Sequence, residues 1–172
     1  MTCHLIHGPA SPVYLVDGDG QLLSEISIAG TVDVADGWDV IPLSDVTANN
    51  SNKLFAVPSG YMYQILWIYV ELTSTATAGN RNLAVATVNN AGIQTFEVRC
   101  GATQAASLTY NYSFGPSLAD LTAARDTTFV MTPIPPTILL LPLWQLRVWD
   151  QNAVAAGADD MNVYVVVARH TV

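Results

Sequence analysis

Two stretches of the chain are rough copies of one another, and this internal repeat constrains the fold more than any other feature. Each copy consists of a proline, a long β-prone run, a small polar loop containing Ala-Gly, and a second β-prone run. The first copy covers residues 57–88, and the second covers residues 141–167, about 80 residues later. We interpret each copy as a β-hairpin. Two similar hairpins predict an all-β protein with a jelly-roll-like two-sheet β-sandwich.

Other segments supply the remaining strands of this sandwich. Residues 82–88 and 93–99 alternate on either side of a turn at 89–92, a pattern that predicts a hairpin. Residues 61–72 are mostly apolar on both faces of the expected strand, so we expect cover on both sides and assign the even-numbered face to the core. The predicted core includes Leu66, Ile68, Val85, Val148 and Val165.

Charge is distributed unevenly along the chain. Residues 1–52 contain seven acidic residues and no Lys or Arg, so they carry seven of the eight net negative charges. Glycines interrupt every β-prone piece of this part. The contrast predicts an extended acidic N-terminal arm, residues 1–52, followed by a β-sandwich domain, residues 53–172. The interface candidates in the arm are Val13, Tyr14, Leu15, Val16, Ile28, Val32, Val34 and Trp38.

The composition indicates a protein that works in an assembly. Only 12% of its 172 residues are charged, whereas 51% are hydrophobic, and a monomer of this size normally carries more surface charge. Much of the surface is therefore expected to be buried against other subunits. The alternative is a sandwich that solvates itself with Ser, Thr, Asn and Gln.

The sequence predicts neither a membrane span nor a signal peptide. Residues 130–149 form the longest apolar stretch, but four prolines and Arg147 interrupt it. The N-terminus lacks a basic segment followed by a continuous apolar one. Cys3 and Cys100 are too few for a disulfide framework, so we expect reduced thiols and assembly in the cytoplasm.

No group of residues predicts a metal site. Residues 17–20 begin like a calcium loop, but Gln21 and Leu22 stand where the loop needs Asp or Asn and then Gly. A cluster of Cys3, His4 and His7 lacks a fourth zinc ligand. The acidic pair at residues 159–160 is interpreted as solvated loop carboxylates, so no metal is expected.

Enzymatic and nucleic-acid functions are also disfavoured. The chain has no nucleophile, phosphate-loop or dinucleotide motif, and its three histidines, including His170, lie near the chain ends. We therefore expect no catalytic residues and no cofactor. Six scattered basic residues on a chain of net charge −8 would not bind a phosphate backbone.

Aromatic residues on a β-sandwich leave one further function open. Exposed rings can stack on sugars, as in carbohydrate-binding modules, although core packing explains most rings in such a fold. A glycan is therefore kept as an alternative ligand. The candidate stacking residues are Trp38, Trp144, Trp149, Tyr61 and Tyr110.

Several short strings resemble small virion proteins of tailed bacteriophages. They are VPSGY (57–61), TAGNR (77–81), SLT and YSF (107–114), LLLPLWQLRVWD (139–150) and ADDM (158–161), with SPVYLVDG (11–18) and AGTVDV (29–34) in the arm. The resemblance implies a jelly-roll capsid decoration, or cement, protein. Such a protein would sit on the capsid surface as a homotrimer and clamp neighbouring subunits of the major capsid protein. A head-to-tail or tail accessory protein is the alternative within this class.

Overall fold

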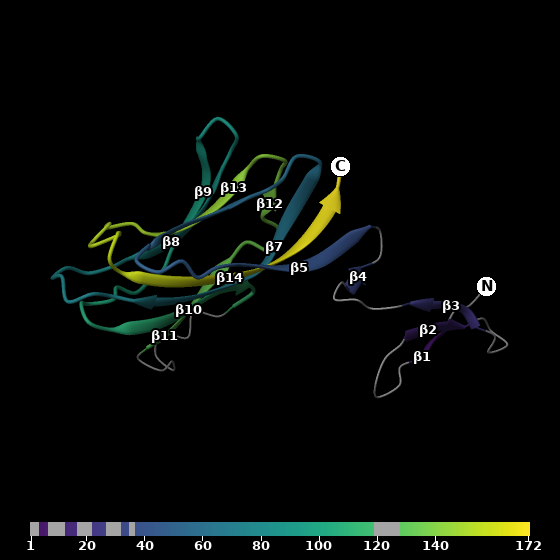
Figure 1. Cartoon of the computed structure of the whole chain (residues 1–172), viewed down its shortest axis with the longest axis horizontal. Coiled ribbons are helices and arrows are strands. Elements are labelled where there is room, and N and C mark those ends of the chain that lie inside the picture. Colours follow the sequence, from purple (N-terminus) through teal and green to yellow (C-terminus); the bar gives the residue numbers. More distant parts are fainter. Residues whose placement is uncertain (1–3, 7–12, 17–21, 27–31, 35–36, 119–127) are drawn as a thin grey trace.

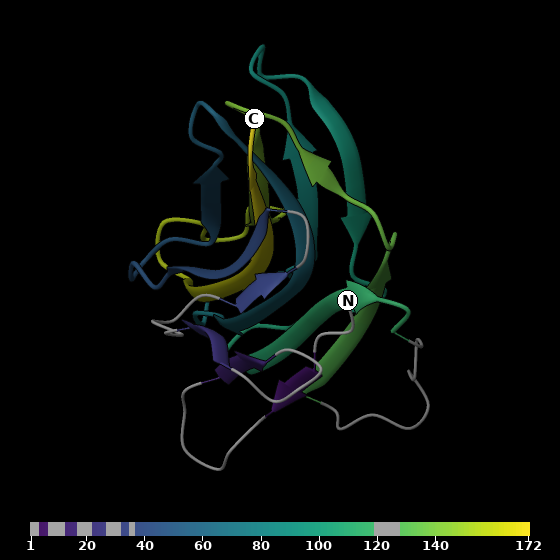
Figure 2. The ribbon, with the colours of Figure 1, turned by 90° about the vertical axis from the view of Figure 1, so that its right-hand side faces the viewer.

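The computed structural model describes residues 4–6, 13–16, 22–26, 32–34, 37–118 and 128–172. Within these residues the chain forms fourteen β-strands in three sheets (Figure 1). The two larger sheets pack face to face around one apolar core (Figure 2). The predicted all-β, two-sheet sandwich is therefore confirmed.

The larger sheet has seven described strands in the order β11-β10-β7-β14-β5-β4, with β12 also paired to β7. Neighbouring strands are antiparallel except β10 and β11, which are parallel. Pro133 in β11 lies on the edge strand, where its missing N–H removes no interior ladder bond. The strands are β4 (Val32–Val34), β5 (Trp38–Asp45), β7 (Tyr61–Thr73), β10 (Thr109–Pro116), β11 (Phe129–Ile134), β12 (Leu139–Leu140) and β14 (Asp160–Thr171).

The smaller sheet of the sandwich has four described strands in the order β6-β13-β8-β9, all antiparallel. The predicted hairpin of β8 and β9 is confirmed. Its turn is closed by the N–H of Gly92, which donates to the Asn89 carbonyl at 3.0 Å. The strands are β6 (Asn52–Ala56), β8 (Leu83–Val88), β9 (Gln94–Arg99) and β13 (Gln145–Asp150).

The internal repeat folds differently from the two hairpins predicted for it. Strands β7 and β8 lie in different sheets, and so do β13 and β14. Each copy is a crossover between the sheets, and the copies pair with each other through β7–β14 and β8–β13. The hairpin interpretation was wrong because the connections, residues 74–82 and 151–159, are longer than the roughly two to five residues that close most hairpins.

A β-bulge in β7 reverses which side chains face the core. In the β14 pairing, Val166 is opposite Trp67 and Val167 is opposite Ile65, so Leu66 is the extra residue. Before the bulge, odd-numbered residues are buried, and after it even-numbered ones are. The predicted burial of Leu66 is therefore wrong, since this side chain is only half-buried. The other predicted core residues, Ile68, Val85, Val148 and Val165, are confirmed as buried.

The N-terminal strands form a separate small sheet. Within the described part of the chain, β1 (His4–Ile6), β2 (Val13–Val16) and β3 (Leu22–Ile26) pair only with one another (Figure 1). The sandwich begins earlier than the boundary predicted at residue 53, because β5 pairs along its length with β14. Because residues 1–52 are rich in acids, their composition predicts an arm that includes β5. In the structure, Asp39 and Asp45 of this strand pair with Arg169 and Lys53 of the sandwich. Whether the preceding segment acts as an arm stays a prediction.

Candidate functional site

The outer face of the seven-stranded sheet is the most distinctive surface of the sandwich. The bulge in β7 turns Trp67 outward, opposite Val166 of β14, and Tyr69 lies opposite Tyr164 in the next outward pair. Trp67, Val166 and Tyr164 are 37%, 36% and 46% exposed. These side chains form an outer aromatic face, defined here by Trp67, Tyr69, Tyr164 and Val166.

The ring of Trp67 lies against the backbone of β10. A Cβ built on Gly115 would stand 2.6 Å from Cε3 and 2.7 Å from Cζ3 of Trp67. Only a residue without a side chain leaves space for the indole at this position. Gly115 therefore holds one side of the Trp67 ring on the sheet, and the ring is left partly open to solvent on the outer face.

Polar groups border the aromatic face at one end. The Tyr69 hydroxyl donates to Asn111 Oδ1 at 2.7 Å, and Asn162 Nδ2 donates to Glu71 Oε1 at 3.2 Å. The rings of Tyr69 and Tyr164 lie 6.1 Å apart in a tilted arrangement. The described carboxylates on this face, Glu71 and the exposed Asp160, lie at the end of the strands beyond the tyrosine pair, so the area around Trp67 and Val166 can be buried at low electrostatic cost.

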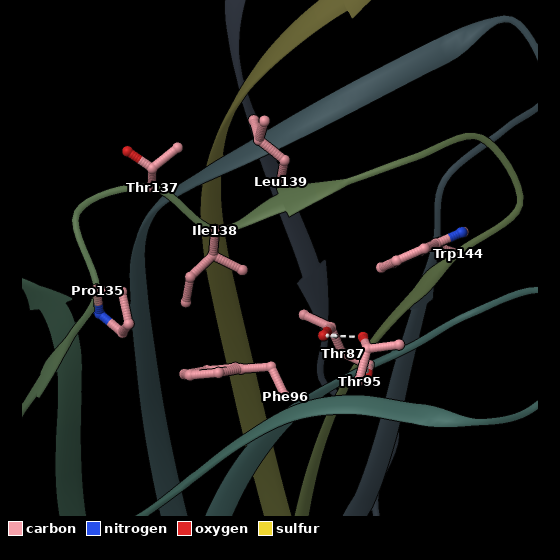
Figure 3. Close-up of a pocket in the computed structure, with 8 residues that line it drawn as sticks. All are labelled: Thr87, Thr95, Phe96, Pro135, Thr137, Ile138, Leu139 and Trp144. Carbon is pink, nitrogen blue, oxygen red and sulfur yellow. Dashed lines mark hydrogen bonds between the residues drawn. The ribbon is translucent and has the colours of Figure 1, made fainter.

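A pocket of about 270 Å³ opens between the two sheets (Figure 3). Phe96 lies across it, with Pro135 and Ile138 on the opposite wall, and Trp144 stands at one side. Its polar groups include the hydroxyls of Thr87 and Thr95, which bond to each other at 2.7 Å. None of its lining residues is acidic, basic or a histidine, so the pocket offers no acid–base group.

The predicted interface residues fall on several different elements. Trp38 begins β5, and its ring stacks on His170 with centroids 5.1 Å apart, so it is part of the sandwich. Residue Ile28 lies outside the described residues. Val13, Tyr14, Leu15 and Val16 make up β2, and Val32 and Val34 bound β4.

The aromatic residues proposed to bind sugars are largely used in packing. Trp149 is buried, while Tyr110, Trp144 and Tyr61 are half-buried against the core. The more exposed rings, Trp67 and Tyr164, were not among those candidates. A strand period of two assigns Trp67 to the same face as the buried Ile65, and only knowledge of the bulge would have separated them.

One acidic residue has a role that the sequence did not reveal. Asp159 is fully buried and accepts two hydrogen bonds from the Arg81 guanidinium, so its interpretation as a solvated loop carboxylate was wrong. Burial opposes ionisation of Asp159, but hydrogen bonds from Arg81 and Thr75 outweigh it and lower its pKa. Asp160, its neighbour, is exposed.

The remaining candidate ligands do not form a cluster in the described residues. Cys3, His7 and residues 17–20 lie outside them, whereas Cys100 is buried. Across the described ranges, no three His, Cys, Asp or Glu side chains come together in a way that could hold a metal ion. The same ranges contain no helix with the length and hydropathy needed to cross a bilayer.

Two of the six basic residues are withdrawn from the surface. Lys53, the one lysine of the sequence, is fully buried and donates to Asp45 Oδ1 at 2.9 Å and to the Thr47 carbonyl at 2.6 Å. Arg81 is also fully buried. Both cations are therefore paired inside the sandwich and add no positive charge to its surface.

No protein-family model matches the chain, and no curated protein matches it either. Its function is therefore inferred from its own residues.

Proposed function

We propose that this chain is a non-enzymatic structural protein of a virion that decorates a phage capsid and stabilises it by clamping neighbouring major capsid subunits. The observation that carries the proposal is the outer aromatic face, where Trp67, Tyr164 and Val166 are exposed side by side. A contiguous apolar patch with little charge is typical of a protein–protein interface.

Two further properties favour a mechanical role. The sandwich has an extensive buried core, and its described pockets lack a group of acid–base residues. Burying apolar area contributes about 25 cal/mol per Å², so a broad flat contact would resist the outward pressure of packaged DNA. Attachment as a homotrimer would multiply this contact, because linked binding events share one loss of translational freedom. A head-to-tail or tail accessory role would use the same face.

Binding to empty shells of the phage that encodes the chain tests this proposal. The full chain should co-sediment with the shells, and light scattering should give the mass of a trimer. A Tyr164→Ala/Val166→Thr variant removes two exposed apolar groups and should weaken binding at least tenfold, which corresponds to about 1.4 kcal/mol. An Ile93→Thr variant removes an exposed apolar group beside the β8–β9 turn of the other sheet and should bind normally.

A carbohydrate-binding function is the second candidate, and the polar border of the outer aromatic face favours it. Glu71, Asn111 and Asn162 lie beside exposed rings, an arrangement that suits sugar hydroxyls and sugar faces. A glycan array distinguishes the two functions. Glycan binding that is lost in Tyr164→Ala, together with no binding to shells, would replace the capsid proposal.

A further inference from the structure

The outer face of the four-stranded sheet differs from the outer aromatic face in its charge. Arg147 on β13 and Arg99 on β9 point outward on this sheet, as do Ala84 and Ala86 on β8 between them. Glu97 is the acidic residue of the face. We call this surface, defined by Leu54, Glu97, Arg99, Arg147 and Trp149, the arginine face.

The Trp149 ring at the centre of this face positions the Arg147 guanidinium. Ala84 and Ala86 leave space for Trp149, which is buried against them. The Arg147 guanidinium carbon lies 4.5 Å from the centroid of the Trp149 ring, and its Nε donates to Asn52 Oδ1 at 2.9 Å. Within the described residues, neither terminal nitrogen of Arg147 makes a hydrogen bond, so both are available to a carboxylate.

The rest of the face is open and net positive. Arg99 is 57% exposed and pairs with Glu97, whose pKa is lowered chiefly by this hydrogen bond. Two arginines against one glutamate leave an excess of one positive charge. A shallow hollow of about 330 Å³ lies beside Arg147, and the exposed Leu54 forms part of its wall.

The complementary charge is found in the N-terminal segment of the same chain. Residues 1–36 contain Asp17, Asp19, Glu25, Asp33 and Asp36, with no Lys or Arg. By contrast, the next two acidic residues already have partners in the sandwich: Asp39 pairs with Arg169, and Asp45 pairs with Lys53. A segment with five carboxylates and no internal base needs an external source of positive charge when it is brought into a contact.

The backbone of the arginine face offers a second means of attachment. In the four-stranded sheet β6 and β9 are the edge strands, and each has one side without a hydrogen-bonded strand neighbour among the described residues. An incoming extended segment could add to either edge. Strand addition would set the register, and the arginines would select an acidic sequence.

We propose that the arginine face of one copy binds the acidic N-terminal segment, residues 1–36, of a second copy. Carboxylates of that segment pair with Arg147 and Arg99, and its apolar residues contact Leu54. This inference deepens the proposed function, on which it rests for the need to bring several copies together. It assigns the contact between copies to the small sheet and leaves the outer aromatic face for the shell.

The strand order favours binding of the arginine face by the N-terminal segment of a second copy over binding by the N-terminal segment of the same chain. Strand β4 pairs with β5 in the seven-stranded sheet, whereas the arginine face is on the side of the four-stranded sheet that is opposite to the core. Stacked sheets lie about 10 Å apart. The five residues between β3 and β4 span at most about 18 Å, so crossing both layers would use most of that length.

Sedimentation of the full chain over a range of concentrations tests this contact. The wild-type protein should self-associate, and the association should weaken at least tenfold between about 50 mM and about 500 mM salt, because exposed charge pairs are screened. An Arg99→Gln/Arg147→Gln variant should weaken self-association at least tenfold. An Ala76→Glu/Thr103→Glu variant changes the net charge by the same amount on loops outside the arginine face and should associate normally.

Three additional measurements make the outcome decisive. Arg99→Lys/Arg147→Lys keeps the charge and should retain salt-sensitive association, and thermal melting should show that each variant is folded. Combining Arg99→Glu/Arg147→Glu with Asp17→Arg/Asp19→Arg should restore association that the first pair abolishes. A monomeric wild-type protein, or equal association of the wild type and the glutamine variant, would overturn the inference. Shell binding by the Tyr164→Ala/Val166→Thr variant tests the proposed function separately.

Discussion

Arg81 and Asp159 form a fully buried, bidentate ion pair that joins the two crossover loops of the internal repeat, residues 74–82 and 151–159. Arg81 Nε lies 2.8 Å from Asp159 Oδ2, and Nη2 lies 3.0 Å from Oδ1. The other guanidinium protons reach the carbonyls of Thr77 and Gly79, each at 2.8 Å, and the Thr75 hydroxyl at 3.1 Å. With every donor satisfied, this charge can remain inside the protein.

Breaking this pair should destabilise the sandwich strongly. Replacing Asp159 with Asn leaves the Arg81 charge buried without its counter-ion, and loss of one partner of such a pair typically costs about 3–5 kcal/mol. Urea denaturation would measure the change. The neighbouring Asp160→Asn is the matched control: Asp160 is exposed, and an Asn keeps an oxygen that can accept the hydrogen bond from the Asn49 N–H, so its effect should stay within about 0.5 kcal/mol. Equal effects of the two changes would contradict the buried role of Asp159.

The same pair predicts how stability depends on pH. Asp159 has a pKa below its reference value of 3.8 in the folded state, so the unfolded chain binds its proton first as the pH falls. Its contribution to stability is complete above about pH 5 and is lost as the pH drops through 3.8 toward the folded pKa. The difference in melting temperature between wild type and Asp159→Asn should therefore be constant near neutrality and shrink below about pH 4.

The bulge in β7 predicts unequal effects for two residues close together on one strand. Ile68 is fully buried, so Ile68→Ala should cost about 2–5 kcal/mol. Leu66 is the extra, half-buried residue, and Leu66→Ala should cost less than about 2 kcal/mol. Thermal or urea unfolding of both variants measures the difference. A larger loss at Leu66 would show that the strand keeps one inward face throughout.

Gly115 should tolerate a side chain poorly, because the Trp67 ring occupies the place of its Cβ. In Gly115→Ala the ring must move, and overpacking of this kind costs about 1–3 kcal/mol. The displaced indole should also weaken shell binding. Gly101→Ala is the control: a Cβ at that site would have no atom within 4 Å beyond its chain neighbours, so little change in stability is expected. Urea unfolding would measure the change in stability, tryptophan fluorescence would report the displaced ring, and co-sedimentation with shells would measure binding.

Strands β7, β8, β9, β13 and β14 could be predicted from the sequence because their residues are β-prone and are bounded by turn or loop residues. The β8–β9 hairpin has alternating runs around a short turn, and local geometry determines its pairing. The partners of β7 and β13 could not be predicted in the same way. Long loops separate them from the next strand, and the choice of sheet depends on contacts that are distant in sequence, such as Arg81 with Asp159.

The candidate surfaces were harder to predict than the fold. The exposure of Trp67 follows from a single bulged residue, which shifts the alternation of β7 by one position. Likewise, the acidic composition of residues 1–52 placed residues 38–45 in an arm, because the bases that pair with Asp39 and Asp45 come from other strands. In both cases a local pattern was overridden by pairing with a distant strand.

The position of β5 predicts that two N-terminal truncations will behave differently. Removing residues 1–36 leaves β5 paired with β14 and should yield a folded sandwich that no longer self-associates. Removing residues 1–52 also deletes β5, and with it the Asp45 carboxylate and the Thr47 carbonyl that hold the buried Lys53 ammonium. An unpaired buried charge costs about 3–5 kcal/mol, so this shorter chain should melt at a much lower temperature.

A substitution separates the two contributions to this loss. Lys53→Met in the chain lacking residues 1–52 removes the unpaired charge but does not replace the strand, so it should recover only part of the lost stability. Circular dichroism melting of the two truncated chains and of this variant makes the comparison. Equal melting temperatures for the two truncations would show that β5 is dispensable and that the sandwich begins at residue 53. A lower melting temperature for the shorter chain alone would show that β5 belongs to the folded domain and would confine the separable arm to the residues before it.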